Sequence, residues 1–181
     1  AVARLERVAA ARPARPALDP QASYLVTGGF GGLGLRTAEW LADRGARQVV
    51  LMGRTSPSAL AEVAIAGLAA RDVTVTRVLG DVAQEADVRA ALAAVPGRLA
   101  GVVHAAGTLD DGSLADLDWP RVRRVLEAKV VGAWLLDRLT DGLDLFILYS
   151  SAAGLVGSSG QANHVAANAF LDALAARRHA R

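Results

Sequence analysis

Short runs rich in apolar and β-branched residues alternate with longer amphipathic runs along most of the chain. The short runs are typical of β-strands, and the sequence predicts five of them, over residues 23–27, 48–52, 73–79, 100–105 and 144–150. Nearly continuous apolar strands that are separated by helices are typical of a parallel sheet with both faces covered. This alternation therefore predicts an α/β fold with a doubly wound parallel sheet and helices on both of its faces.

The longer runs predict helices over residues 33–45, 57–72, 85–95 and 119–140, and a last helix from about residue 163 to the end. Pro120 lies in the first turn of the fourth helix, where proline is tolerated. Residues 1–22 predict a short helix and a Pro-rich linker, and residues 23–181 predict a single domain. Because the chain lacks an initiator Met, we expect it to be a piece of a longer polypeptide.

The composition argues against several classes of protein. Apolar residues make up 52% of the 181 residues and charged residues 21%, which favours a globular domain over a disordered chain. No run approaches the ~20 apolar residues of a membrane-spanning helix, and the Arg- and Pro-containing N-terminus is not that of a signal peptide. The chain has no cysteine, which excludes disulfides and a thiolate metal site, and we expect a cytoplasmic protein. We also expect no other metal site. A net charge of +2 and only 4% aromatic residues argue against nucleic-acid binding.

A glycine-rich stretch joins the first predicted strand to the first predicted helix, in the sequence YLVTGGFGGLGLRTAEWLADRG. Gly29, Gly31 and Gly34 fit the pattern GxGxxG, whose glycines allow a tight turn, close approach to a pyrophosphate and close packing of helix on strand. The N-terminus of the helix adds free N–H groups and the positive end of its dipole. A strand before the turn and a helix after it favour a Rossmann-like dinucleotide site over a flexible glycine loop without a ligand.

The end of the second predicted strand indicates which dinucleotide binds. An acidic residue there binds the 2′-hydroxyl of an adenosine ribose, whereas an arginine accommodates a 2′-phosphate. This strand ends in LMGRTS, which offers Arg54 and Thr55 and no carboxylate. The sequence therefore predicts NADPH as the cofactor, and an ordinary surface charge is the alternative for Arg54.

Three polar positions stand out in the second half of the chain. Lys129 is the single lysine among 20 basic residues, and arginine cannot replace a compact ammonium whose pKa can be tuned. In GQANHVAANAF, residues 160–170, His164 and Asn168 are four residues apart and share one face of a helix. All three are candidates for chemistry. The alternatives are chance retention of the lysine at the surface and ordinary, satisfied helix residues.

The order of the motifs resembles that of the short-chain dehydrogenase/reductases: TGxxxGxG beginning at Thr27, then GDV at 80–82, then HAAG at 104–107. More narrowly, YLVTGGFGGLGL, VVHAAGTLDDGSL, VLEAKVVGAWLLDRLT and LYSSAAGLVGSSGQANHVAANAFLDALAARR resemble the ketoreductase domain of modular type I polyketide synthases. The resemblance runs from Tyr24 to Arg178.

The resemblance implies where an NADPH cofactor and the catalytic groups lie. Asp81 and Val82 are expected at the adenine ring, and residues 105–107 beside the nicotinamide ribose. The full set expected at the cofactor is Thr27, Gly28, Gly29, Phe30, Gly31, Gly32, Leu33, Arg54, Thr55, Asp81, Val82, Ala105, Ala106, Gly107 and Lys129. The catalytic residues that the resemblance implies are Lys129, Ser151, His164 and Asn168.

His164 stands where the family has its proton-donating tyrosine, thirteen residues after the serine. The pKa of a free histidine is about 6.5, and a close Lys129 lowers it further. Neutral imidazole can donate one N–H but is a poor proton source, so reduction is either impaired or runs through a bridging water or a shifted substrate. Imidazole as a general acid near its own pKa remains chemically sound. Tyr24 and Tyr149 lie in predicted strands and are expected in the core.

Leu109, Asp110 and Asp111 resemble the LDD signature of ketoreductases that form the D-configured hydroxyl. No tryptophan follows Trp134, whereas the opposite class has one near position 156. We therefore expect a D-configured product, and a solvated turn before Gly112 is the alternative reading of the two acidic residues.

The resemblance implies NADPH-dependent reduction of a β-ketoacyl thioester to the β-hydroxyacyl thioester during polyketide chain extension. The expected partners are an acyl carrier protein domain, which tethers the substrate through phosphopantetheine, and other domains of the same synthase. Two alternatives stay open: a reductase-like scaffold or epimerising domain with reduction impaired by His164, and a stand-alone short-chain dehydrogenase on a small alcohol. A ketoreductase continues into a further strand and a lid, so we expect the domain to be C-terminally incomplete.

Overall fold

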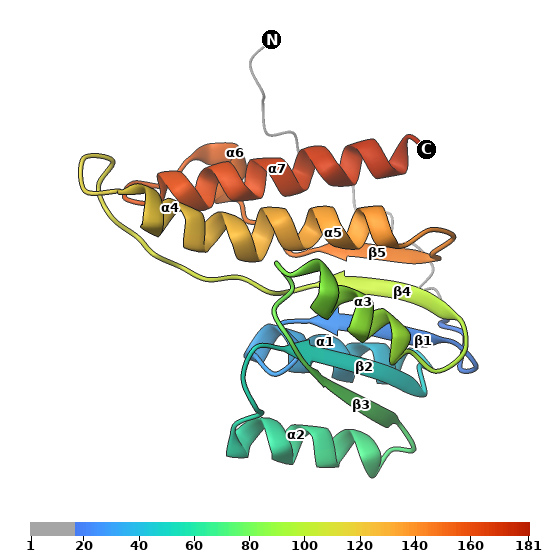
Figure 1. The fold of residues 1–181 in the computed structure, drawn as a ribbon. Coiled ribbons are helices and arrows are strands. Elements are labelled where there is room, and N and C mark those ends of the chain that lie inside the picture. The colour runs from blue at the N-terminus through green and yellow to red at the C-terminus, as the bar shows by residue number, and fades with distance from the viewer. Residues whose placement is uncertain (1–16) are drawn as a thin grey trace, which may run out of the picture.

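A computed structural model describes residues 17–181 as a parallel sheet with helices on both faces (Figure 1). The strands are β1 (Ser23–Thr27), β2 (Gln48–Gly53), β3 (Thr74–Leu79), β4 (Leu99–His104) and β5 (Leu145–Leu148), in the order β3-β2-β1-β4-β5. The chain runs outward from β1 to β3 and then crosses back to place β4 on the other side of β1. The predicted doubly wound α/β fold is therefore confirmed.

The reversal of direction between β3 and β4 creates the place where such a sheet binds ligands. Neighbouring connections leave the carboxyl ends of β1 and β4 in opposite directions, which opens a crevice at that edge. At this edge Thr27 of β1 pairs with Met52 of β2 on one side and with His104 of β4 on the other. The register thus places residues from three strands at the mouth of the crevice.

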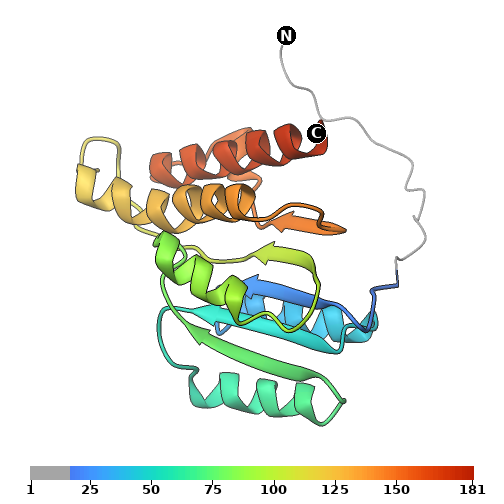
Figure 2. The ribbon, with the colours of Figure 1, turned by 45° about the vertical axis from the view of Figure 1, so that its right-hand side comes forward.

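Alternation along the strands divides the core between the two faces of the sheet. Tyr24 and Val26 of β1 pack in the cluster under α1 (Gly32–Asp43) and α2 (Ala59–Ala69). Leu25 packs in the opposite cluster, under α3 (Glu85–Ala93) and α5 (Gly132–Leu139). Figure 2 shows α1 behind the sheet and α3 in front of it. The helix α7 (Ala162–His179) lies beside α5 and also contacts β5.

The segment predicted as one helix over residues 119–140 is divided into three elements. It begins as α4 (Trp119–Leu126), which Asp118 caps by accepting a hydrogen bond from the N–H of Arg121 at 3.0 Å. It then passes through the π-helical turn η1 (Glu127–Val131) and continues as α5. Single π-turns inside helices are frequent at functional sites. Lys129 lies within this turn.

The other predicted elements agree with the structure to within about two residues at most ends, which is the usual scatter of assigned boundaries. Strand β5 is shorter than predicted, and the short helix α6 (Ala153–Val156) was not predicted. The predicted N-terminal helix falls mainly on residues outside the described part of the chain, and residues 17–22 contain a turn. Among residues 17–181, no helix combines the length and apolar character needed to cross a membrane.

Candidate active site

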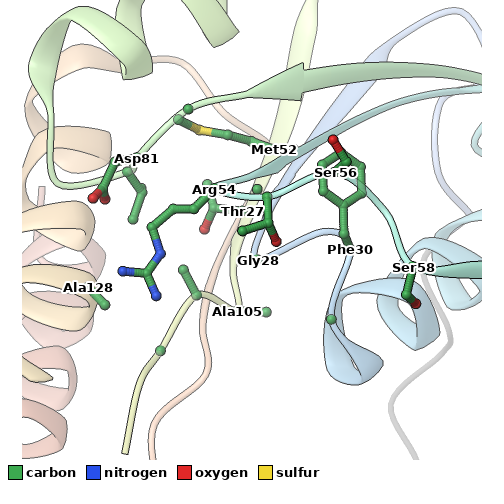
Figure 3. Close-up of a pocket in the computed structure, with 17 residues that line it drawn as sticks. Thr27, Gly28, Phe30, Met52, Arg54, Ser56, Ser58, Asp81, Ala105 and Ala128 are labelled. Atoms are coloured by element: carbon green, nitrogen blue, oxygen red, sulfur yellow. The ribbon is translucent and has the colours of Figure 1, made fainter.

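A cavity of about 420 Å³ opens at the carboxyl edge of the sheet (Figure 3). Four strand ends and η1 contribute to its wall, so it lies at the switch point of the fold. The predicted cofactor residues on this wall are Thr27, Gly28, Phe30, Gly31, Arg54, Thr55, Asp81, Val82, Ala105, Ala106 and Gly107. Gly29, Gly32, Leu33 and Lys129 are not on the wall. Met52, Gly53, Ser56, Ser58, Gly80 and Ala128 line it without having been predicted.

The turn after β1 has the backbone that a phosphate site requires. Gly28 has a φ of +67°, a left-handed conformation, and a Cβ there would lie 2.7 Å from the backbone N of Ala106. Gly31 precedes α1 and contributes no side chain, and the first turn of α1 contains no acidic residue. The first N–H groups of this 12-residue helix are therefore free of side-chain partners, and Gly31, which precedes the helix, lies on the cavity wall. This arrangement fits an anionic group such as a pyrophosphate.

The end of β2 supplies a cation and hydroxyl groups to the same cavity. Arg54 extends into it, and its Nη2 donates a hydrogen bond to Oγ1 of Thr108 at 3.2 Å (Figure 3). Within residues 17–181, Arg54 forms no ion pair with a carboxylate. The hydroxyls of Thr55, Ser56 and Ser58 line the same wall. A cation and several hydroxyls without a carboxylate at this strand end fit a ribose 2′-phosphate.

The four predicted catalytic residues come from three segments that hydrogen bonds hold together. Nζ of Lys129, on η1, donates to the carbonyl oxygen of Tyr149 at 2.8 Å, just after β5. Ser150 donates from Oγ to the carbonyl oxygen of Asn168 at 3.3 Å. Within α7, Nδ2 of Asn168 donates to the carbonyl oxygen of His164 at 2.7 Å. The structure thus brings η1, the end of β5 and the first turns of α7 to one place.

Ser151 lies three residues after the end of β5, in the turn that leads into α6. Its Oγ accepts a hydrogen bond from the N–H of Ala153 at 3.2 Å, while the side chain remains partly exposed. An acceptor role toward the backbone leaves the hydroxyl hydrogen free to donate elsewhere. Ser151 can therefore cap its turn and still present a donor.

Burial lowers the pKa of both Lys129 and His164, and for His164 the nearby charges contribute as well. Burial lowers the pKa of the Lys129 ammonium below its ordinary value. Burial is also the main reason that the pKa of His164 lies below 6.5, and the charge of Lys129 adds to this effect. Asp111 raises the pKa of His164 in the opposite direction, but its effect is the smallest of the three. His164 is therefore mainly neutral at neutral pH.

Two buried polar atoms in this group have no hydrogen-bond partner among the described residues: Nδ1 of His164 and Oδ1 of Asn168. Buried polar atoms are paired in the great majority of cases, and exceptions are often places where a ligand or water binds. Both atoms belong to the first turns of α7. For a polar ligand, Oδ1 of Asn168 is an acceptor. Nδ1 of His164 is an acceptor or a donor, depending on the imidazole tautomer.

Neither tyrosine replaces the missing phenol at this place. The hydroxyl of Tyr24 donates to the carbonyl oxygen of Asp19 at 3.3 Å, and its ring is buried in the core. The hydroxyl of Tyr149 bonds Oγ1 of Thr37, on α1, at 2.9 Å. Tyr24 is in a strand and in the core, as the sequence predicted, whereas Tyr149 lies just after β5 and is only partly buried against the core.

The loop that contains Leu109, Asp110 and Asp111 is bonded to two helices and is more than a solvated turn. Asp110 forms ion pairs with Arg121 and Arg124 of α4, and both arginines lower the pKa of its carboxyl. Nε2 of Gln161 donates to Oδ2 of Asp111 at 2.8 Å. Leu109 is exposed. These contacts connect the loop to α4 and to the start of α7, which contains His164.

His104 is a residue of this region to which sequence reasoning gave no role, although it begins the HAAG motif. It is buried at the end of β4, where Nδ1 lies 2.7 Å from Oγ1 of Thr27 and Nε2 lies 3.3 Å from the carbonyl oxygen of Lys129. Burial and the charge of Lys129 lower its pKa to about 4. A lone histidine in an otherwise apolar strand was the signal that could have drawn attention to it.

Comparisons with known proteins agree with this geometry. The KR domain family matches residues 22–181. Polyketide synthase GfsB of Streptomyces halstedii is 47% identical over 171 residues, which cover 91% of this chain and 3% of the synthase. The chain thus spans only a small part of the curated relatives that it matches.

Two solved ketoreductase structures are similar to this chain in fold. The first ketoreductase of the tylosin PKS is similar with a TM-score of 0.86 and 40% identity, over 96% of this chain and 38% of that one. A structure of A-type ketoreductases from a modular polyketide synthase has a TM-score of 0.84 and 40% identity, over 92% of this chain and 38% of that one. Together with the match over residues 22–181, these likenesses show that the chain belongs to the KR family, the ketoreductase domains of polyketide synthases in the short-chain dehydrogenase/reductase superfamily.

Proposed function

We propose that this domain uses NADPH to reduce a β-ketoacyl thioester to the β-hydroxyacyl thioester during polyketide chain extension. Family membership implies ketoacyl reduction with a nicotinamide cofactor. The observation that carries the finer proposal is the convergence of the segments that contain Lys129, Ser151, His164 and Asn168 at the edge of the sheet where the cavity opens.

The cavity wall supports NADPH over NADH. Arg54 has no carboxylate partner among the described residues, and it lies with three hydroxyl side chains at the strand end where the adenosine ribose binds in this fold. The carboxylate that would bind a free ribose diol is absent from that strand end. Phosphate oxygens match a guanidinium in both charge and geometry.

The chemistry requires donors that stabilise charge on the substrate oxygen. The nicotinamide cofactor, when bound, supplies a hydride to the carbonyl carbon. The hydroxyl of Ser151 and an N–H of His164 donate hydrogen bonds to the oxygen on which negative charge develops, and one such donor is worth about 3 kcal/mol. Lys129 adds a positive field, and Asn168 holds the carbonyl oxygen of His164 and thereby the start of α7.

Proton delivery is the demanding step for this chain. Protonated imidazole is the stronger acid, but the lowered pKa of His164 leaves only a minor part of it protonated at neutral pH. The rate of reduction is therefore expected to fall as the pH rises above that pKa, which lies below 6.5. A tyrosine at this position, with a pKa near 10, would keep its proton across the same range.

The family and the acidic loop support the proposed substrate and product configuration. The relatives are much longer polyketide synthases, which supports an acyl carrier protein domain as the partner that presents the substrate through phosphopantetheine. Other domains of the same synthase are the remaining proposed partners. The sequence at residues 109–111 supports a D-configured hydroxyl, and the ion pairs of Asp110 give that loop a fixed place beside α7.

A second candidate function is a reductase-like scaffold or an epimerising domain with little reduction. The lowered pKa of His164 favours it, because an imidazole that has mainly lost its acidic proton at neutral pH replaces the proton donor of the family. The stand-alone dehydrogenase is disfavoured by the similarity to long synthases over most of the chain.

The test is the oxidation of NADPH in the presence of a β-ketoacyl pantetheine thioester, with chiral chromatography of the product. The native chain is compared with His164→Tyr, which restores the donor of the family, and with His164→Phe, which keeps an aromatic ring but has no donor. We expect slow, D-selective reduction by the native chain, a faster rate for the Tyr variant and none for the Phe variant.

Three outcomes separate the alternatives. If the native chain binds NADPH without turnover while His164→Tyr reduces the thioester, reduction by the native chain is refuted. Exchange of the α-hydrogen of a 2-methyl-3-ketoacyl thioester with deuterated solvent then identifies an epimerising domain. If no dinucleotide binds to the native chain, the whole proposal fails.

A further inference from the structure

His104 connects the glycine-rich turn to the helix that contains the single lysine. Its ring is 1% exposed, at the carboxyl end of β4. Nδ1 lies 2.7 Å from the hydroxyl oxygen of Thr27, the last residue of β1. Nε2 lies 3.3 Å from the carbonyl oxygen of Lys129. Since a carbonyl can only accept, Nε2 is the protonated nitrogen, and Nδ1 accepts the hydrogen of the Thr27 hydroxyl.

The carbonyl oxygen that His104 binds belongs to the π-turn η1. A π-turn replaces the regular i to i+4 ladder with wider hydrogen bonds, and the carbonyl oxygen of Lys129 accepts from the N–H of Gly132 as well as from His104. The chain also approaches His104 closely at Gly132, the residue that follows η1. A Cβ there would lie 3.0 Å from Cε1 of His104 and 2.8 Å from Cγ1 of Val82. Only glycine fits there without displacement of the turn.

The side chain of Lys129 is fixed at its other end. Nζ donates to the carbonyl oxygen of Tyr149 at 2.8 Å. A Cβ at Gly107 would lie 3.3 Å from Cε of Lys129, so the aliphatic part of the lysine lies close against the backbone that follows β4. Lys129 is therefore held at both ends: its carbonyl oxygen bonds His104, and its ammonium bonds the carbonyl oxygen of Tyr149.

We propose that His104 is a positioning residue that fixes the π-turn and so determines where the ammonium of Lys129 lies. It does so by accepting from Thr27 and donating to the Lys129 carbonyl, which couples the cofactor turn to the lysine through one buried side chain. That Lys129 serves reduction rests on the proposed function, but the positioning itself does not. Burial holds the pKa of His104 at about 4, so the imidazole stays neutral and keeps Nδ1 as an acceptor at working pH.

Replacing His104 by glutamine or by asparagine tests the two contacts of the imidazole ring separately. In His104→Gln the amide nitrogen reaches about as far as Nε2, so it can still donate to the Lys129 carbonyl. In His104→Asn the amide reaches only about as far as Nδ1, so it keeps the contact with Thr27 and loses the one with Lys129. The variants are matched in polarity and differ by one methylene.

The readout is the titration of Lys129 itself, which needs no turnover. Because Lys129 is the only lysine, trace acetylation with isotopic acetic anhydride labels its side chain and, as an internal reference, the α-amine. After denaturation and exhaustive acetylation, trypsin releases residues 125–138 as one peptide, and mass spectrometry gives the labelled fraction at each pH. His104 and His164 are the titratable groups coupled to Lys129, and both are mainly neutral where the lysine titrates.

We expect the native chain and His104→Gln to show Lys129 with a pKa below 10.5, and His104→Asn to show a pKa closer to 10.5 because the ammonium becomes better hydrated. Gly132→Ala disturbs the same contact from the helix and gives the same shift, so the test stands even if His104→Asn does not fold. An unchanged Lys129 titration in both His104→Asn and Gly132→Ala, or a shift as large in His104→Gln, overturns the proposal. A native chain that neither binds NADPH nor reduces thioesters refutes the proposed function and leaves this result intact.

Discussion

At the scale of single residues, the two histidines beside Lys129 differ in what surrounds them. His104 has a partner for each ring nitrogen, whereas Nδ1 of His164 is buried without one among the described residues. Burial lowers the pKa of both imidazoles. The neutral form of His104 is the one that can form both of its contacts, and the neutral form of His164 holds fewer protons for the proposed reduction. Burial thus favours the hydrogen bonds of His104 and reduces the protonated fraction of His164.

The buried state of His104 predicts a dependence of stability on pH. Its pKa is about 4 in the folded chain and 6.5 when unfolded, so only the unfolded chain gains a proton between those values. The contribution is full above pH 6.5 and is lost as the pH falls toward 4. Between pH 7 and pH 5 the free energy of unfolding should fall by about 2 kcal/mol from His104. Urea unfolding, followed by tryptophan fluorescence, measures this change.

His104→Gln is the control for that prediction, because it removes the titrating group and leaves His164 in place. The fall between pH 7 and pH 5 should be smaller in this variant by the His104 contribution. The same fall in both proteins would show that His104 is not buried in the neutral form.

At the scale of elements, sequence patterns predicted β1 to the residue and failed within residues 119–140. β1 is a local run of buried residues between a turn and a glycine-rich stretch, so its pattern suffices. The π-turn η1 has no proline and no local break to announce it. It depends on contacts with His104, at the end of β4, and with Val82, in the segment after β3, and both residues are remote in sequence. Helical periodicity cannot show such a contact.

The loop at residues 109–112 should depend more on Arg121 than on Arg124. Arg121 bonds the carboxylate of Asp110, the carbonyl oxygen of Asp111 and that of Asp116, whereas Arg124 bonds only Asp110. Arg121→Gln should therefore accelerate amide hydrogen exchange of the loop, and Arg124→Gln should do so much less. Hydrogen exchange with mass spectrometry compares the two. Equal acceleration would contradict the role of Arg121.

The ion pairs between α5 and α7 should contribute measurably to stability. The Asp137 carboxylate is 1% exposed and pairs with Arg177 and Arg178 of α7. Asp137→Asn leaves these cations without their counter-charge and should lower the free energy of unfolding by about 3 kcal/mol. The exposed Arg181 lies 3.8 Å from the same carboxylate, so Arg181→Gln should cost less than about 1 kcal/mol. Chemical denaturation at pH 7 measures both free energies of unfolding. Similar losses in the two variants would show that the buried ion pairs of Asp137 do not contribute more than the exposed one.

At the scale of the whole molecule, the parallel topology was predictable because strands and helices alternate in the sequence. The motif residues on the cavity wall were also predictable, because glycine and arginine at strand ends have recognisable roles. Ser58 and Ala128 were not, since they reach the cavity through the start of α2 and through η1. Their place follows from how distant elements pack, and the same holds for the contact between Gln161 and Asp111.

Binding of the cofactor should stabilise the whole domain, because the cavity wall draws on four strand ends and one helix. At a concentration of 100 Kd, a ligand that binds only the folded state adds about 2.7 kcal/mol. NADPH should therefore raise the thermal midpoint more than NADH at equal concentration. Differential scanning fluorimetry measures both.

In Arg54→Leu, NADPH and NADH should raise the thermal midpoint by more similar amounts, because the cation for the 2′-phosphate is lost. Arg36→Leu is the matched control, since Arg36 pairs with Glu39 on the surface of α1 and lies outside the cavity wall. A preference for NADPH that survives Arg54→Leu would place the phosphate elsewhere.

Helix α7 contains His164, the proposed proton donor, near one end and the arginines that pair with Asp137 near the other. Fourteen residues separate His164 from Arg178, which corresponds to about 21 Å along the helix axis. A tilt of only about 5° around the anchor at Asp137 moves the imidazole by about 2 Å, and an error of about 1 Å can slow a reaction about 100-fold. If His164 serves the proposed reduction, the ion pairs of Asp137 therefore determine in part how accurately it is placed.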